Sequence, residues 1–272
     1  MTPNTAILAG MAVANIFYGI HFNLYVISTY LFARHFKGDK ANPLYRSMLF
    51  VSSGILFILI TANTILLTVR VFQGFILSTG GPALFFRDQT QATSVVLNTV
   101  TMSSLVVNDL MMIHRLYTVW CRTKLIMILP LVAWIGFTVC AVLTVVDRRS
   151  TSNLALVVSI TPNFVFTLAV NVYCTVFIAW KIYTNTKACM LVDGTDLRDL
   201  LAMLVESSAL YTSWALFYTV THQVNDNSQY LAVATLPPIA GIANALFQTR
   251  IVTRRSIEPS EVSQPIQFRA AA

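Results

Sequence analysis

The feature that most constrains this chain is a series of long apolar runs, each separated from the next by a short polar segment. A helix needs about 20 predominantly apolar residues to cross the hydrocarbon core of a bilayer. Only 11% of the residues are charged and 56% are hydrophobic, whereas soluble domains carry about 25% charged residues. The pattern therefore predicts an all-α, polytopic membrane protein whose main partner is the lipid bilayer.

Seven of these runs are long enough to be spans. The expected spans cover residues 6–32, 47–69, 93–119, 125–146, 154–183, 199–222 and 229–252. Together they predict one seven-helix transmembrane domain over residues 1–255. The polar segment 256–272 contains two prolines and is expected to be a disordered cytoplasmic tail. The first run has no basic segment before it, so we expect it to stay as a span and not to be cleaved as a signal peptide.

Glycine and proline mark the breaks between and within these spans. The Gly-Gly-Pro sequence at 80–82 predicts a break in the loop between the second and third spans. Pro162 leaves two alternatives for the fifth span: a long helix from Leu154 with a kink, or a shorter helix that starts after Thr161. The Pro-Pro pair at 237–238 predicts a kink or a break in the seventh span.

The distribution of Lys and Arg predicts the orientation. Fourteen of the 18 basic residues lie on the side that carries the first, third and fifth loops and the C-terminus. The four on the other side are Arg70, Arg87, Arg148 and Arg149. Cytoplasmic loops collect Lys and Arg, so the N-terminus is expected outside and the C-terminus in the cytosol. The expected location is the plasma membrane. The same bias accounts for the net charge of +7. The sequence has no basic patch interleaved with aromatic residues outside the spans, so nucleic-acid binding is not expected.

Three ionisable residues are expected within the membrane: Asp109 and Arg115 in the third span and Glu206 in the sixth. Charges there are costly and usually face the bundle interior. Asp109 and Arg115 are six residues apart, about 240° around a helix, so they cannot share a face. If Arg115 pairs with a carboxylate, Glu206 on another helix is therefore the better candidate, and the expected polar network also includes Asn244. Such a network can be structural, a switch that breaks on activation, or a proton or ion relay.

Residues with catalytic or cofactor chemistry are sparse. The four histidines fall at different depths, which argues against a zinc or di-iron site. The seventh span contains no lysine to anchor retinal. No nucleophile elbow or phosphate-binding glycine loop occurs, and the four cysteines suggest no extracellular disulfide framework. We expect no cofactor, no metal and no enzyme activity, with a membrane cyclase that uses Asp109 and Glu206 as the remaining enzymatic alternative.

Three stretches resemble a known family. They are DLMMIHRLYTVW (109–120), VESSALYT (205–212) and LPPIAGIANALFQTRI (236–251). They are similar to the uncharacterised seven-transmembrane, GPCR-like membrane proteins of mushroom-forming basidiomycete fungi. The resemblance carries over to Asp109, Arg115, Tyr117, Trp120, Glu206, Tyr211, Pro238, Gly241 and Arg250. Asn244 stands where relatives often have Pro or Thr. The resemblance implies a seven-span topology and a fungal source, but it implies no biochemical function.

A second resemblance is to G-protein-coupled receptors, through seven spans, an external N-terminus and an Arg near the inner end of the third span. The chain departs from that family in having no acid directly before Arg115 and no Asn-Pro-x-x-Tyr motif. The leading hypothesis is an orphan GPCR-like sensor of a small ligand, with a heterotrimeric G protein on its cytoplasmic face. The candidate ligand contacts are His21, Asn98, Asn171 and Tyr211, and interhelical hydrogen bonding is the alternative role for the histidine and the asparagines. The alternative function is a proton-coupled carrier that uses Asp109 and Glu206.

Overall fold

The computed structural model describes residues 2–35, 43–78, 81–88, 90–120, 125–147, 153–188, 194–224 and 226–261. This part of the chain is helical and contains no strand. The elements are α1 (Pro3–His35), α2 (Pro43–Phe72), η1 (Gln73–Leu77), α3 (Pro82–Arg87), α4 (Ala92–Val119), η2 (Leu125–Met127), α5 (Ile128–Asp147), α6 (Asn153–Ala188), α7 (Gly194–Gln223) and α8 (Ser228–Glu261).

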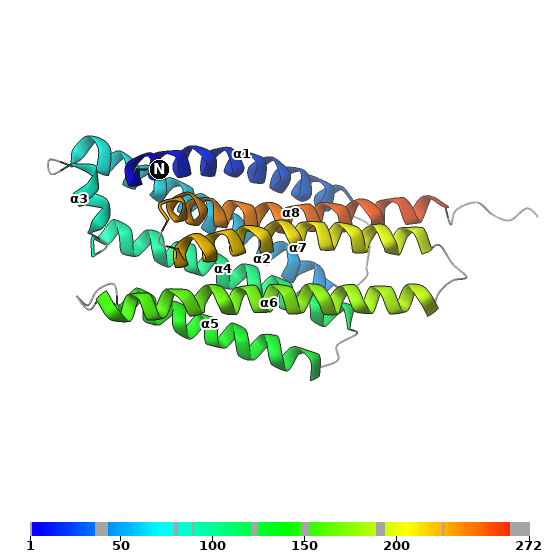
Figure 1. The fold of residues 1–272 in the computed structure, drawn as a ribbon. Coiled ribbons are helices and arrows are strands. Elements are labelled where there is room, and N and C mark those ends of the chain that lie inside the picture. The colour runs from blue at the N-terminus through cyan, green and yellow to red at the C-terminus, as the bar shows by residue number, and fades with distance from the viewer. Residues whose placement is uncertain are drawn as a thin grey trace, which may run out of the picture.

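The long helices run up and down in one bundle, with each helix antiparallel to the one before it (Figure 1). The N-terminus lies at the same end as the short helix α3, and the C-terminal end of α8 lies at the other end. Helix α3 lies across the bundle axis at the end that carries the N-terminus. It packs on the π-helical turn η1, where a Cβ added to Gly74 would come within 2.5 Å of Phe86.

Six helices in the described part of the chain are long and apolar enough to cross a membrane. They are Pro3–Arg34, Phe50–Leu77, Ala92–Tyr117, Leu125–Val146, Asn163–Lys181 and Ser228–Thr249. We therefore describe the chain as an integral membrane protein with an all-helical fold. The expected sixth span corresponds to α7, which has 30 residues but is not among these six.

Several local expectations can be compared with the structure. Helix α6 is continuous from Asn153 to Ala188, so Pro162 lies inside a long helix, as the first of the two alternatives held. Helix α8 runs through the Pro-Pro pair at 237–238 without a break, and both prolines are buried against the rest of the bundle. Neighbouring helices can hold the backbone of a membrane helix at such a pair. It also continues to Glu261, into the segment expected to be disordered; residues 262–272 lie outside the described residues.

Helix α8 is the central helix of the bundle. Within its membrane-spanning part, Ser228–Thr249, 72% of the residues in an apolar 18-residue stretch are buried. The corresponding share within Leu125–Val146, which covers η2 and most of α5, is 17%. Helix α1 packs against it through Ala6, Gly10 and Ala14, which recur every four residues. A Cβ on Gly10 would lie 3.0 Å from the Cα of Leu231. Small residues at this spacing let two membrane helices approach closely.

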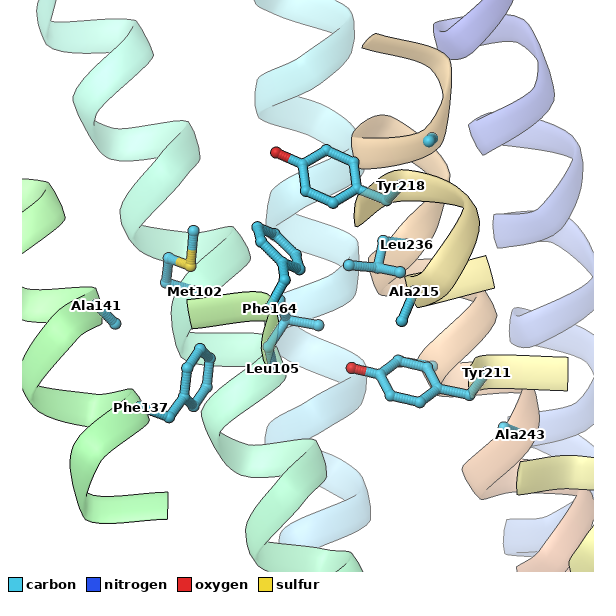
Figure 2. Close-up of a cluster of buried hydrophobic side chains, with 12 residues drawn as sticks. Met102, Leu105, Phe137, Ala141, Phe164, Tyr211, Ala215, Tyr218, Leu236 and Ala243 are labelled. Atoms are coloured by element: carbon cyan, nitrogen blue, oxygen red, sulfur yellow. The ribbon is translucent and has the colours of Figure 1, made fainter. Parts of the chain in front are cut away.

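An apolar cluster fills the bundle between α4, α5, α6, α7 and α8 (Figure 2). Its larger members include Met102, Leu105, Phe137, Phe164, Tyr211, Tyr218 and Leu236. Tyr211 points from α7 into the centre of the bundle, where it is 2% exposed. The cluster thus borders the polar site described next, and Tyr211 belongs to both.

Candidate functional site

Helix α4 brings three buried polar residues to the centre of the bundle. Asn108, Asp109 and Arg115 are 3%, 0% and 4% exposed. Asn108 and Arg115 are seven residues apart, which places them on the same face of a helix, while Asp109 is turned by about 100° from Asn108. Helix α4 therefore presents polar groups on two faces. The Asp109 face contacts α6, and the Asn108–Arg115 face contacts α8.

The Asp109 carboxyl is held by donors from α6. The hydroxyl of Thr167 donates to Oδ2 at 2.5 Å, and Nδ2 of Asn171 donates to Oδ1 at 3.0 Å. The hydroxyl oxygens of Thr167 and Tyr211 are 3.3 Å apart, which extends the contact to α7. All the donors to Asp109 seen in the described part of the chain are neutral side chains. This cluster joins α4, α6 and α7.

The Arg115 guanidinium joins α4 to α8. Its Nη2 donates to Oδ1 of Asn244, and Nδ2 of Asn244 donates to Oδ1 of Asn108. The guanidinium carbon lies 3.9 Å from the ring centroid of Phe247, a cation–π contact. Nη1 lies 3.5 Å from the sulfur of Met112. These contacts bury the charged group in an amide- and aromatic-lined site.

A small cavity lies between the two clusters. Its lining comes from α4, α6, α7 and α8: Asn108, Met112, Arg115, Asn171, Ser207, Ser208, Tyr211, Ala243 and Asn244. It has room for about one water molecule. Asn171 contributes to both features, because it lines the cavity and donates to Asp109. Asp109 itself does not line the cavity.

The structure changes the expected position of Glu206. Asp109, Arg115 and Asn244 are buried as described, but the Glu206 side chain is exposed. On α7 the inward-facing residues are Ser207, Ser208 and Tyr211. Glu206 is one residue before them, turned by about 100° from Ser207. Glu206 therefore does not share the inward-facing side of α7 with Ser207, and a buried partner of Arg115 from another helix is Asn244.

Two of the four candidate ligand contacts lie at this site and two do not. Asn171 and Tyr211 line the cavity. His21 on α1 is 3% exposed and packs against Phe57 and Gly241. Neither of its ring nitrogens makes a hydrogen bond of normal geometry, although the Gly241 backbone is close enough to interact. Asn98 lies three turns earlier on α4 than Asp109, half-buried, and no partner is seen for its Nδ2.

Sequence reasoning did not single out four residues that belong to the site. They are Asn108, Thr167, Ser207 and Ser208. A helical spacing signal was present for each: Asn108 is seven residues before Arg115, Thr167 is four before Asn171, and the two serines are four and three before Tyr211. Residues at these spacings share a helix face, so each lies on the same face as a residue already selected.

Within the described residues, no group of three or more His, Cys, Asp or Glu side chains could hold a metal ion. Comparisons with known proteins give no match, whether with protein-family models, with curated proteins or with solved structures. The resemblance to the fungal seven-span family therefore stays a prediction.

Proposed function

We propose that this protein is a GPCR-like sensor that crosses the membrane seven times, with its N-terminus outside. The support for a seventh span is α7, whose 30 residues cover about 45 Å at 1.5 Å per residue, longer than a bilayer core of about 30 Å. Its neighbours in the bundle are α6 and α8. The fourteen-to-four bias of Lys and Arg supports the orientation. A reporter fused to the C-terminus should accordingly be active only on the cytosolic side.

The observation that carries the sensor proposal is the buried polar network centred on α4. Asp109 ties α4 to α6 and, through Thr167, to Tyr211 on α7. Arg115 ties α4 to α8 through Asn244. A shift of any of these helices by 1–2 Å, the usual size of such movements, must break or exchange these hydrogen bonds. A ligand that favours one arrangement would therefore change the cytoplasmic ends of the same helices.

The test is guanine-nucleotide exchange on a panel of fungal heterotrimeric G-protein α subunits, with the purified chain in nanodiscs. We expect exchange above that of empty nanodiscs, and we expect Arg115→Ala to reduce it at least tenfold. Arg115→Ala removes the Arg115–Asn244 hydrogen bond between α4 and α8, which is one of the contacts that a shift of these helices would break or exchange. Retention of the unfolding temperature within a few degrees would show that the variant is folded.

An exchange rate that is equal for the wild type and Arg115→Ala would contradict the role of this network. Exchange that never exceeds the empty-nanodisc value, with every α subunit and with extracts of candidate ligands added, would contradict the sensor proposal itself.

A second function, a proton-coupled carrier, is favoured by a separate observation. Asp109 is 0% exposed, its described donors are neutral side chains, and it adjoins a polar cavity through Asn171. An ionisable group at this depth in a membrane protein often marks a proton or ion pathway. The hydroxyls of Thr167 and Tyr211 offer a hydrogen-bonded route away from the carboxyl.

Liposomes that contain the protein and a pH-sensitive dye test the carrier. If the carrier function is real, an imposed pH gradient should collapse faster than in empty liposomes, and Asp109→Asn should return the rate to the empty value. Asparagine keeps the shape of aspartate and can still accept from Thr167, so loss of flux would report the missing carboxyl. Equal fluxes with and without the wild-type protein would remove this alternative.

A further inference from the structure

We propose that the outward face of α1 around Gly19 binds α1 of a second copy of this chain, as a parallel pair within the membrane. Two asparagines on this membrane-spanning helix, Asn15 and Asn23, have exposed side chains. The middle of the span Pro3–Arg34 lies between Tyr18 and Gly19, so the two asparagines are about 5 Å and about 7 Å from it along the helix. The hydrocarbon core extends about 15 Å to each side of its middle, so both amides face lipid.

The two amide groups are only partly satisfied within their own helix. Nδ2 of Asn15 donates to the carbonyl of Met11 at 3.0 Å, and Nδ2 of Asn23 donates to the carbonyl of Gly19 at 2.8 Å. Among the residues that the structure describes, neither side chain makes a further hydrogen bond. Each amide therefore keeps one N–H group and its oxygen for another partner. Lipid tails offer no such partner, so leaving these groups unpaired costs free energy.

Other asparagines in the membrane find that partner on a different helix. Four buried ones bond to a side chain across a helix interface: Asn63 to Thr101, Asn163 to Thr144, Asn171 to Asp109 and Asn244 to Asn108. In the described part of the chain, α1 contacts α2, α3 and α8, and it lies at the edge of the bundle (Figure 1). A helix that pairs with Asn15 and Asn23 in the same way must therefore come from outside this bundle.

The shape of the face allows another helix to approach closely. A Cβ added to Gly19 would meet nothing within 4 Å. Asn15 and Asn23 are each four residues from Gly19, which places them about 40° to either side of it around the helix. Gly10, which packs on Leu231 of α8, is nine residues before Gly19 and so lies on the opposite side. Helix α1 thus has one glycine at its contact with α8 and another on its outward face, where a small residue favours helix pairing.

Apolar side chains continue this face in both directions. Leu8, Phe22, Val26 and Tyr30 are 48%, 45%, 49% and 61% exposed. All four fall within about 60° of Gly19 around the helix. The strip from Leu8 to Tyr30 is about 33 Å long, close to the thickness of the hydrocarbon core. Two such strips can therefore pack over the whole depth of the membrane.

The partner that fits these positions best is a second copy. Copies of one chain have the same orientation in a membrane, so a symmetric pair of α1 helices is parallel and brings residues of equal number to equal depth. Each asparagine then lies beside its own counterpart. An amide both donates and accepts, so asparagine is complementary to itself. A different protein would need polar groups at these same two depths. The pair does not depend on the proposed sensor function.

The experiment measures energy transfer between full-length copies that carry a donor or an acceptor fluorescent protein at the C-terminus, in phosphatidylcholine liposomes. We expect the transfer to rise and saturate as the protein-to-lipid ratio increases. The double variant Asn15→Leu/Asn23→Leu should move the midpoint to a density at least about tenfold higher, because two amide pairs are lost. Ser213→Leu on α7 is the matched control, since Ser213 is also exposed and bonds to its own helix through the Leu210 carbonyl.

Oxidative cross-linking with copper phenanthroline gives a second measurement on the same membranes. Asn15→Cys and Asn23→Cys should each form a covalent dimer in higher yield than the wild type. Ile20→Cys is the control, because Ile20 is exposed at a similar depth but is turned by about 100° from Gly19. In excess detergent, which separates the copies, the double leucine variant should unfold within about 2 °C of the wild type, since both side chains lie outside the bundle.

Three outcomes would overturn the proposal. Transfer that stays at the level of random proximity at every density would show that lipid or another protein covers this face. A midpoint that the double leucine variant leaves unchanged would show that the copies meet elsewhere. If that variant does not fold, cross-linking decides: equal dimer yields for Asn15→Cys and Ile20→Cys exclude this face, and a higher yield for Asn15→Cys supports it.

Discussion

Replacement of Gly241 by leucine is expected to lower the free energy of unfolding by about 3 kcal/mol, at the upper end of the usual cost of overpacking. Gly241 lies on the central helix α8, where α1 and α2 meet it. Even a single added Cβ would lie 2.5 Å from Cδ1 of Ile60 and 2.7 Å from Cε1 and Nδ1 of His21. Ile60 is 0% exposed and His21 is 3% exposed, so neither can move aside freely.

The measurement is the unfolding temperature in detergent micelles, and the expected decrease is roughly 6–12 °C. Gly19→Leu is the matched control, because a Cβ added to Gly19 on α1 meets nothing within 4 Å. The control should change the unfolding temperature by no more than about 2 °C. Equal effects of the two substitutions would show that helix propensity, and not the contact with His21 and Ile60, decides the result.

A double variant can locate the clash. Ile60→Val removes Cδ1, the atom closest to the added Cβ. In the background of Gly241→Ala, this change should recover part of the lost stability, since residues in contact show coupling energies of about 0.5–3 kcal/mol. In the wild-type background it should only destabilise, because it removes a buried methyl group.

Replacement of Thr167 by valine is expected to cost about 1.5 kcal/mol of unfolding free energy. Valine has nearly the shape of threonine but no hydroxyl, so it removes the 2.5 Å hydrogen bond to Oδ2 of Asp109. Interhelical hydrogen bonds in membrane proteins average about 0.6 kcal/mol and reach about 1.7 kcal/mol. The upper end applies here because Asp109 is 0% exposed and would keep a single α6 donor, Asn171.

Thr175→Val on the same helix is the control for this change. The Thr175 hydroxyl donates to the backbone carbonyl of Asn171, within its own helix. Its removal should change the free energy of unfolding by no more than about 0.5 kcal/mol. Equal losses for Thr167→Val and Thr175→Val, measured by reversible denaturation in mixed micelles, would mean that the Asp109 contact does not stabilise the bundle.

Much of the helical pattern could be predicted, and the reason is physical. An apolar run of about 20 residues has few alternatives to a membrane helix, because each backbone polar group must be bonded within the segment. The expected span 93–119 accordingly matches α4, which covers Ala92–Val119. The ends were less predictable: proline inside α6 and α8 did not end either helix, since packing of neighbouring helices overrides local preference.

The site was only partly predictable. Asp109, Arg115 and Asn244 could be selected because polar residues in apolar runs are rare and costly. Their partners could not, because depth along the membrane says nothing about the rotation of each helix around its axis. Glu206 was expected in the same polar network as Asp109, yet it faces outward while Ser207 faces the cavity.

By itself, the sequence determined that this chain forms apolar helices, where most of them run, and that a few polar residues must be accommodated among them. These properties follow from the length of each run and its transfer free energy, which are local. The tertiary structure alone decided that Asp109 bonds to α6 and Arg115 to α8, and that a cavity of about one water lies between them. Those contacts depend on how the helices rotate and approach one another, which close packing of small residues such as Gly10 and Gly241 sets across the whole bundle.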